Sequence, residues 1–159
     1  MKTTFASRAQ KITTFLTFNN EAEEAMNLYT SVFPNARVVS VSRMGEQFFS
    51  GVFEIEGQQF MVLNGGPHFS FSPGTSLFVR CQTQAEVDSF WEKLTAGGGR
   101  EEQCGWLQDR FGVSWQIIPT ALETFLSDPD SEKSGRAMQA MLQMQKIDIA
   151  ALTRAFEGN

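Results

Sequence analysis

Two similar helix patterns, one early and one near the middle of the chain, limit what this sequence can fold into. Each has apolar residues at the i, i+3, i+4, i+7 spacing of an amphipathic helix, after a polar residue with glutamate three positions further on. The second apolar stripe is the first one shifted by a constant offset. The stripes are Ala25, Leu28, Tyr29 and Val32 after Asn20 and Glu23, and Val87, Phe90, Trp91 and Leu94 after Thr83 and Glu86.

Strand-like segments, rich in alternating or β-branched residues, surround both helices. The first helix follows 12–18 and precedes 37–43, 48–55 and 58–64; the second follows 75–81 and precedes 101–104, 105–108 and 113–119. The order β-α-β-β-β therefore occurs twice, which favours an internal repeat. The alternative is an ordinary α+β domain whose halves resemble each other by chance.

The repeat predicts an α+β fold in which tandem β-α-β-β-β modules form one cupped mixed sheet, followed by a helical tail. At 159 residues, the chain is short enough for the modules to share one core. The predicted parts are a loose N-terminal arm (1–10), the paired modules (11–119, divided into 11–67 and 74–119) and the helical tail (120–159).

The predicted tail contains a broad apolar band that is rich in methionine. Asp128-Pro129-Asp130 interrupts its helices, and Asp148 caps the last one. Amphipathic helices usually bury such a band, so we expect it to pack on the core or on a second subunit rather than to bind a ligand. The band consists of Ala137, Met138, Met141, Leu142 and Met144.

The last predicted strand pair is a hairpin around Asp109-Arg110-Phe111-Gly112, which has the residue types of a tight turn. Beyond the turn, side chains alternate between two faces. Trp115 shares one face with Val113 and Ile117, whereas Gln116 shares the other with Ser114 and Ile118. A polar amide among small and apolar groups suits the wall of a cavity.

Composition excludes several kinds of partner. The net charge of -5 argues against a nucleic-acid or anionic-membrane surface. No apolar run approaches the roughly 20 residues of a membrane span, and the first ten residues lack the apolar region of a signal peptide. Cys81 and Cys104 do not form a disulfide framework, so we expect a cytoplasmic protein with reduced thiols.

Several motifs resemble one known family. They are Phe18-Asn19-Asn20 with Glu24-Ala25 and Leu28-Tyr29, Leu63 to Pro67, Cys104-Gly105-Trp106, Asp109 to Ile117, and Met141 to Ala151. These motifs, in a doubled β-α-β-β-β pattern, resemble the PhnB-like branch of the vicinal-oxygen-chelate superfamily. That superfamily includes glyoxalase I, bleomycin-resistance proteins and extradiol dioxygenases, and the branch carries the description 3-demethylubiquinone-9 3-methyltransferase domain. The resemblance covers about residues 12–158 and implies a cavity cupped by two modules and a homodimer.

The resemblance also implies a divalent metal, held in many members by His and Glu side chains from strands of both modules. The matching positions here are Gln116 in the last strand, a residue near Thr14, and Ser76 or Leu77; a fourth would lie on the strand that ends at Asn64. None is His, Asp or Glu, and these neutral donors make a poor site for a transition metal. We therefore expect no metal site and no cofactor, with a weakly bound divalent metal left open.

The candidate ligand-binding residues are polar or aromatic groups that the predicted cavity would bring together. Each has a structural alternative: Trp106 as a core residue, Asn64 as a turn residue and His68 as a solvated side chain. Cys104 could be a reactive thiol, but no His or Lys neighbours it in sequence, which favours an inert one. The candidates are Asn64, His68, Phe69, Trp106, Ser114 and Gln116, and no catalytic residue is assigned.

Three functions remain open, and the first is favoured. The chain could bind a small aromatic or apolar molecule without a metal triad, act as a lyase, isomerase or other metal-assisted enzyme, or form a dimer for protein interaction. A methyltransferase is disfavoured, because a Rossmann-type site needs a glycine-rich turn between a strand and a helix. Gly97-Gly98-Gly99 instead follows a predicted helix, and Gly65-Gly66 precedes a proline and a loop.

Overall fold

The computed structural model describes residues 10–159, so all of the predicted N-terminal arm except Gln10 lies outside the described residues. The chain divides into two compact units, Met1–Ser70 and Phe71–Asn159. We call them unit one and unit two. Each is described by itself below.

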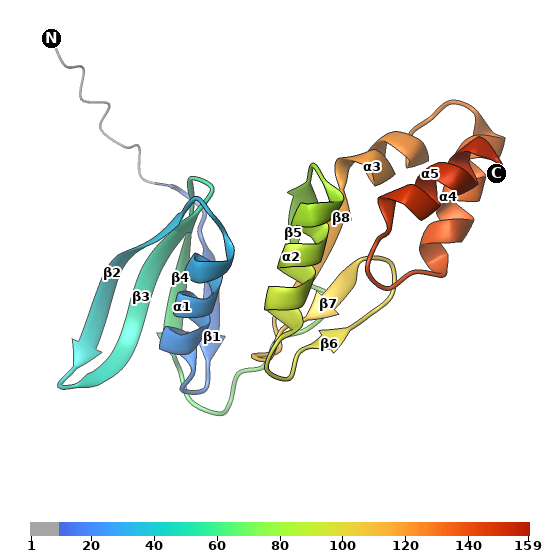
Figure 1. Ribbon diagram of the computed structural model, residues 1–159. Helices are drawn as coiled ribbons and strands as arrows, with labels where there is room; N and C mark the ends of the chain where they lie inside the picture. The colour runs from blue at the N-terminus through green and yellow to red at the C-terminus, as the bar shows by residue number, and fades with distance from the viewer. Residues whose placement is uncertain (1–9) are drawn as a thin grey trace, which may run out of the picture. The chain divides into compact units, whose positions relative to one another are not determined.

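Unit one is a four-stranded mixed sheet with one helix (Figure 1). The sheet has the order β1-β4-β3-β2, and β1 runs parallel to β4 while the other neighbours are antiparallel. The elements are β1 (Thr14–Phe18), α1 (Ala22–Val32), β2 (Ala36–Met44), β3 (Gln47–Ile55) and β4 (Gln58–Asn64).

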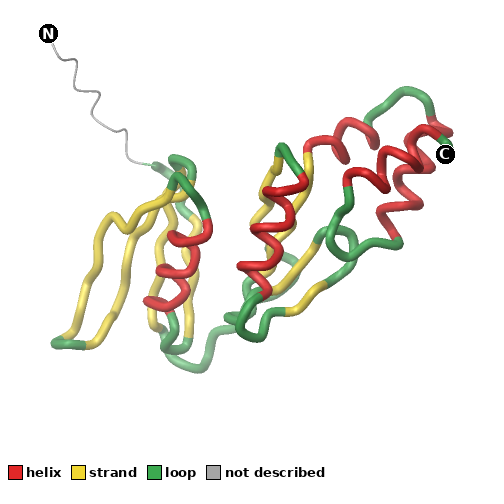
Figure 2. The backbone as a smooth tube through the Cα atoms, viewed as in Figure 1, coloured by secondary structure: helices red, strands yellow, loops and turns green. Residues whose placement is uncertain are grey.

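Unit two repeats this topology and adds three helices at its end (Figure 2). Its sheet has the order β5-β8-β7-β6, again with a parallel pair formed by the first and last strands. The α+β class and the tandem β-α-β-β-β modules are thus confirmed, although the strands form two four-stranded sheets, one in each module, where one shared sheet was expected. The elements are β5 (Ser76–Cys81), α2 (Gln84–Thr95), β6 (Arg100–Glu101), β7 (Trp106–Gln108), β8 (Ser114–Pro119), α3 (Thr120–Leu126), α4 (Ser131–Leu142) and α5 (Ile149–Glu157).

The helices bury most of the predicted stripes. In α2 all of Val87, Phe90, Trp91 and Leu94 are buried, and the Thr83 hydroxyl accepts a hydrogen bond from the Glu86 amide at 3.2 Å, as predicted. In α1 the buried face contains Met26, while Leu28 is only half-buried. The predicted Asn20 cap is wrong, because the N-cap residue is Glu21 and makes no side-chain capping bond.

Strand register shows which residues lie on the face of each sheet away from its helix. In β1, Leu16 and Phe18 are buried towards α1, so Phe15 and Thr17 point to the other side. In β8, Trp115 and Ile117 share one face, and Ser114, Gln116 and Ile118 alternate with them and so point to the other side, where Ser114 and Ile118 are also buried. We call this side the distal face of each sheet.

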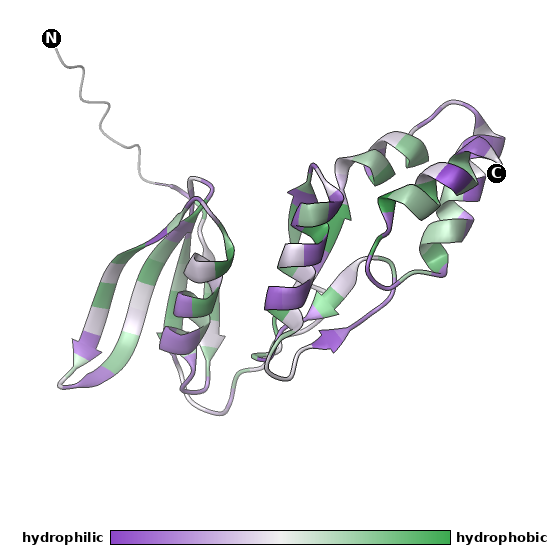
Figure 3. Cartoon of the chain, viewed as in Figure 1, coloured by the Kyte–Doolittle hydropathy of each residue, from purple (hydrophilic) through white to green (hydrophobic). Residues whose placement is uncertain are grey.

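The tail helices build their own small core on the end of β8. Ile118 from β8 packs with Leu122, Ile147 and Leu152 from the tail, all at most 5% exposed. Phe125 of α3 stacks on Phe156 of α5, with ring centroids 4.5 Å apart. Figure 3 shows this C-terminal end of β8 as strongly hydrophobic, in contrast to the hydrophilic β6.

Candidate functional site

A row of three side chains crosses the distal face of the unit two sheet. Gln116 on β8 is paired with Phe78 on β5 and with Trp106 on β7. Directly paired residues project from the same face of a sheet, so the amide lies between two aromatic rings. Phe78 is 43% exposed, and Trp106 and Gln116 are half-buried. The row is therefore partly exposed to solvent.

The Gln116 amide is oriented by its neighbour on β5. Its Nε2 donates a hydrogen bond to Ser76 Oγ at 2.9 Å, which leaves Oε1 directed away from that bond. Ser114 lies on the same face and is 1% exposed, and its Oγ has no hydrogen-bond partner among residues 10–159. The polar side chains beside Gln116, Ser76 and Ser114, are neutral, whereas Arg80 on the same face carries a charge and lies over the Phe78 ring.

The equivalent row in unit one is apolar. Met61 on β4 is paired with Phe15 on β1 and with Val52 on β3, in the same relation as Gln116 to Phe78 and Trp106. Phe15 is 49% exposed and Met61 is 37% exposed. The internal repeat therefore presents equivalent rows with different chemistry, and only the row in unit two offers a hydrogen-bonding group.

The hairpin that carries Gln116 is fixed by a buried carboxylate. Asp109 is 3% exposed, and its Oδ1 accepts hydrogen bonds from the amides of Phe111 at 2.9 Å and Val113 at 3.0 Å. Its Oδ2 accepts one from Trp115 Nε1 at 2.9 Å. Because Trp115 is adjacent to Gln116, these bonds set the register and direction of the Gln116 side chain.

Sequence reasoning missed Phe78 and the orienting role of Ser76. The alternation along 75–81 contains the signal for Phe78, which lies two positions after Ser76 on the same face. Its pairing with Gln116 depends on a parallel crossover, which no local pattern specifies. Ser76 was considered only as a metal ligand, whereas in the structure its hydroxyl is bound to Gln116.

Asn64, which was predicted as a ligand-binding residue, is engaged within unit one. Its Oδ1 accepts a hydrogen bond from the amide of Ala22, the first residue of α1, at 2.9 Å. Its Nδ2 donates to the carbonyl of Phe48 at 3.2 Å. Asn64 therefore supplies the capping group that α1 lacks in its own sequence.

His68 and Phe69 lie in the loop after β4, where both are exposed. Phe69 is 57% exposed, and its ring packs over Gly65, where an added Cβ would come within 3.1 Å of it and still closer to Thr17. Trp106, Ser114 and Gln116 are brought together on one face of unit two. Asn64, His68 and Phe69 belong to unit one.

The residues at the expected metal-ligand positions do not fit a divalent-metal site. The strands β1, β4, β5 and β8 contain no His, Asp or Glu. Thr14 shares its face with the buried Leu16, and the hydroxyl of Ser76 is bound to the Gln116 amide. Within residues 10–159, no three His, Cys, Asp or Glu side chains gather closely enough to hold a metal ion. Neutral amides and hydroxyls are weak ligands for transition metals.

Cys81 is not suited to act as a nucleophile. Burial raises the pKa of the Cys81 thiol to about 12, with a smaller contribution from the charge of Glu86. Cys81 is thus protonated and unreactive at neutral pH. Cys104 is half-buried in a turn, with a positive φ of 61°.

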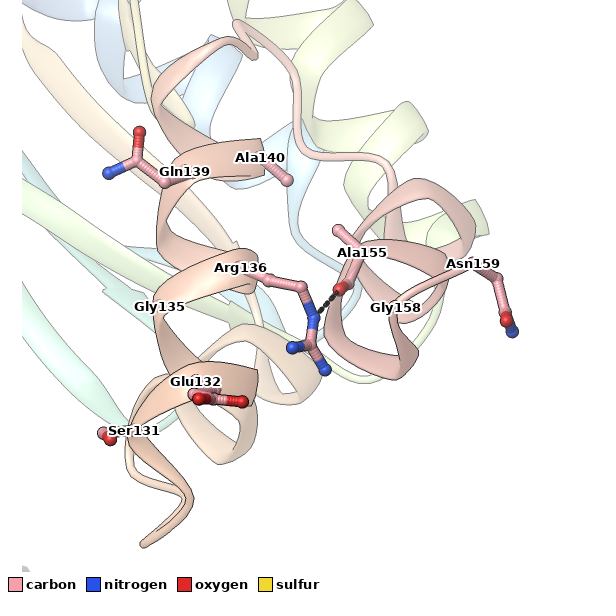
Figure 4. A pocket seen from close by; sticks show the side chains of 9 residues that line it. All are labelled: Ser131, Glu132, Gly135, Arg136, Gln139, Ala140, Ala155, Gly158 and Asn159. Carbon is pink, nitrogen blue, oxygen red and sulfur yellow. Dashed lines mark hydrogen bonds between the residues drawn. The ribbon is translucent and has the colours of Figure 1, made fainter.

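Two depressions lie away from the Gln116 row. One, of about 600 Å³, lies in unit one between α1 and the β2–β3 hairpin, and the Asn64 side chain that lines it is used in capping α1. The other, of about 890 Å³, lies between α4 and the end of α5 (Figure 4). There Arg136 donates hydrogen bonds to the carbonyls of Ala155 at 2.9 Å and Phe156 at 2.8 Å, as a C-terminal cap of α5. Both sets of polar groups already stabilise helix ends.

A known protein family matches most of this chain. A family model described as 3-demethylubiquinone-9 3-methyltransferase matches residues 10–118. The match includes almost all of both sheets and ends before α3, so it does not extend to the tail, where resemblance had been expected. Among curated proteins, none matches the chain.

Solved structures share the fold. The PhnB protein of Bacillus cereus, described as a candidate 3-demethylubiquinone-9 3-methyltransferase, is 39% identical over 69% of this chain and 99% of that chain, with a TM-score of 0.65. A Pseudomonas aeruginosa protein is 18% identical over 70% of this chain and 98% of that chain, with a TM-score of 0.60. The fosfomycin resistance protein FosX of Listeria monocytogenes was solved with Mn(II) and sulfate. It is 14% identical over 70% of this chain and 90% of that chain, with a TM-score of 0.50. The last two show similarity of fold alone.

Proposed function

The chain belongs to the 3-demethylubiquinone-9 3-methyltransferase family, the PhnB-like branch of the vicinal-oxygen-chelate superfamily, and from this premise we propose that it binds a small, uncharged, planar molecule. The molecule lies on the distal face of the unit two sheet, along the row of Phe78, Gln116 and Trp106. No metal or other cofactor takes part.

The observation that supports this proposal most directly is the oriented amide between two partly exposed aromatic rings. Phe78 and Trp106 provide apolar and stacking contacts, and Gln116 Oε1 accepts a hydrogen bond from the ligand. The polar groups beside the row, Ser76 and Ser114, are also neutral. Arg80 lies over the Phe78 ring, 5.1 Å from its centroid, but it is already ion-paired with Glu123, so an uncharged ligand is favoured.

This chain has the fold of the family, but we do not propose the methyltransferase reaction that the family description names. Gly97, Gly98 and Gly99 follow α2 and lead into the short strand β6, whereas a Rossmann-type site needs such a turn before a helix. Gly65 and Gly66 lead from β4 into a loop. Neither glycine run can offer a helix N-terminus to S-adenosylmethionine.

Metal-assisted lyase or isomerase chemistry, the alternative function, has less support. Such chemistry requires several anionic or imidazole ligands around one ion. The strands that would supply them carry Phe15, Met61, Phe78 and Gln116 at the equivalent row positions. The row is therefore suited to contact with an apolar ligand.

The site can be mapped by NMR with indole as the probe, since indole is planar and uncharged and carries one N–H donor. We expect saturable shifts of the Gln116 side-chain amide and the Trp106 indole N–H, with Kd in roughly the millimolar range for so small a ligand. Trp91 serves as an internal control, because its Nε1 donates to Glu101 at 2.6 Å in the buried face of α2. Shifts that spread evenly over the protein, or the absence of shifts at an indole concentration 10-fold above the expected Kd, would refute the site.

We also propose a cytoplasmic homodimer, with α4 in the subunit contact. Met138 and Leu142 on α4 are 41% and 45% exposed, although they belong to the apolar band that was expected to be covered. No helix among residues 10–159 is both long and apolar enough to cross a membrane. Light scattering should give the mass of a dimer for the native chain and of a monomer for the Met138→Lys, Leu142→Lys variant; a monomeric native chain contradicts the proposal.

A further inference from the structure

The segment between α4 and α5 is held on unit two by backbone hydrogen bonds and by the buried side chain of Ile147. The amides of Cys104 and Gly105 donate to the carbonyls of Met144 and Gln145, both at 2.8 Å. This segment, Met144–Ile149, is neither helix nor strand except for Ile149, where α5 begins. We call it the tail segment.

A single side chain on α2 binds the other half of the tail segment. Gln84 Nε2 donates to the carbonyl of Ile147 at 3.0 Å, and Gln84 Oε1 accepts from the amide of Ile149 at 2.8 Å. The side-chain amide thus acts on the segment as a neighbouring strand would, with one donor and one acceptor. Beside it, Lys146 Nζ lies 2.9 Å from Asp88 Oδ1.

The backbone conformation of Cys104 and Gly105 and the absence of a side chain on Gly105 allow the tail segment to lie close to them. Cys104 and Gly105 both have positive φ, 61° and 83°, and their consecutive amides donate to two consecutive carbonyls of the segment. A Cβ on Gly105 would lie 2.7 Å from Ile118 and 3.1 Å from Ile147. Ile147 is fully buried against Ile118 in this groove.

Peptide-binding sites use the same kinds of contact: main-chain hydrogen bonds give affinity, and a buried side chain gives specificity. The groove residues, Gln84, Asp88, Cys104, Gly105 and Ile118, all lie within the part of the chain matched by the family model. The tail segment lies beyond it. The groove therefore belongs to the module, and its occupant belongs to the added tail.

We propose that this groove is a peptide-binding site, occupied by the chain's own tail segment, which also accepts the tail segment of a second copy. Its ligand is a peptide with a buried isoleucine preceded by a lysine. In the intact chain the covalently linked segment is present at a high effective concentration, so exchange between copies requires that this link be cut or opened.

The test uses the full chain with a protease site inserted after Pro129, in the exposed loop between α3 and α4. After cleavage we expect residues 130–159 to remain bound through gel filtration. A fluorescent synthetic peptide of residues 130–159, which keeps the Asp130 cap of α4, should then replace the cleaved fragment in a saturable way, as measured by anisotropy.

Two variants identify the contacts. Gln84→Ala should weaken peptide binding at least 10-fold, whereas the neighbouring exposed Gln82→Ala should leave it unchanged within 2-fold. An Ile147→Ala change made only in the synthetic peptide should abolish displacement, and it leaves the folding of the receiving chain untouched. Loss of the fragment without rebinding, unfolding of the cleaved chain, or equal binding of the Ile147→Ala peptide would each overturn the proposal.

Discussion

At the scale of single residues, Asn64 shows how one side chain can have a structural role where a binding role was expected. Its amide satisfies the first amide of α1 and the carbonyl of Phe48 at once. The residue nearest the helix start that could have served, Asn20, is exposed. The capping group thus comes from a residue distant in sequence.

This assignment predicts unequal effects for the two asparagines. Asn64→Ala should lower the free energy of unfolding by about 1–2 kcal/mol, because a capping bond and a second hydrogen bond are lost. Asn20→Ala, the matched control, should change it by less than about 0.5 kcal/mol, as is usual for exposed positions. Urea unfolding of both variants checks this, and equal effects would mean that α1 is capped in another way.

Gln116 is the residue whose surroundings carry the functional proposal. Its face was predictable, because the alternation from Val113 to Ile118 separates it from Trp115. Its bond to Ser76 was not predictable, because it joins residues 40 positions apart across a parallel strand pair. Local patterns give the direction of a side chain, while its partners depend on topology.

At the scale of elements, the attachment of the tail depends in part on a charge that can be titrated. The hydrogen bond from Gln84 and, next, the bond and charge of Lys146 lower the pKa of Asp88 below its usual value. A carboxylate with a lowered pKa contributes stability above its unfolded-state pKa and loses that contribution as the pH falls through the folded-state value. The contribution is small, since the side chains of Lys146 and Asp88 are 43% and 49% exposed.

Asp88→Asn should therefore lower the stability of the chain slightly at pH 7, by less than about 1 kcal/mol. The difference from the native chain should shrink below about pH 4 and vanish once Asp88 is protonated in the folded state. Urea midpoints measured from pH 7 to pH 2 test this, with the exposed Glu46→Gln variant as control. A difference that stays constant down to pH 2 would show that the charge of Asp88 has no role.

The sequence predicted most elements of this fold but not how the tail is held. Apolar spacing predicted α2, and Thr83 with Glu86 predicted its N-terminal cap. Asp148 caps α5 through the amide of Ala151, as expected. In α1, Met26 takes a buried position that the simple stripe gave to Leu28. The backbone bonds of the tail segment leave no residue pattern, since any residue type supplies the same carbonyl.

At the scale of the whole molecule, a repeated scaffold carries different chemistry in its two copies. The equivalent rows are Phe15, Met61 and Val52 in unit one and Phe78, Gln116 and Trp106 in unit two. Both leave apolar side chains partly exposed on a sheet face, as binding surfaces do. Only the second has a fixed hydrogen-bonding group, so only it can select a ligand by its polar atoms.

The repeat itself was the most predictable property of the molecule, because the spacing of apolar residues recurs through α1 and α2. The chemistry of the rows was less predictable. It depends on which residues face each other across strands, and Val52 and Trp106 become equivalent only through the register of β3 with β4 and of β7 with β8. Fold class thus follows from periodicity, while the site follows from pairing.

The most direct test of the central claim is a calorimetric comparison of indole with 1-methylindole, in the native chain and in Gln116→Ala. The two probes have nearly the same shape, but only indole can donate a hydrogen bond to Gln116 Oε1. We predict that the native chain binds indole about 5-fold more tightly, as expected for one neutral hydrogen bond, and that the variant binds both probes equally. Equal binding of the two probes by the native chain, or a preference for indole that survives in Gln116→Ala, would contradict the proposed site.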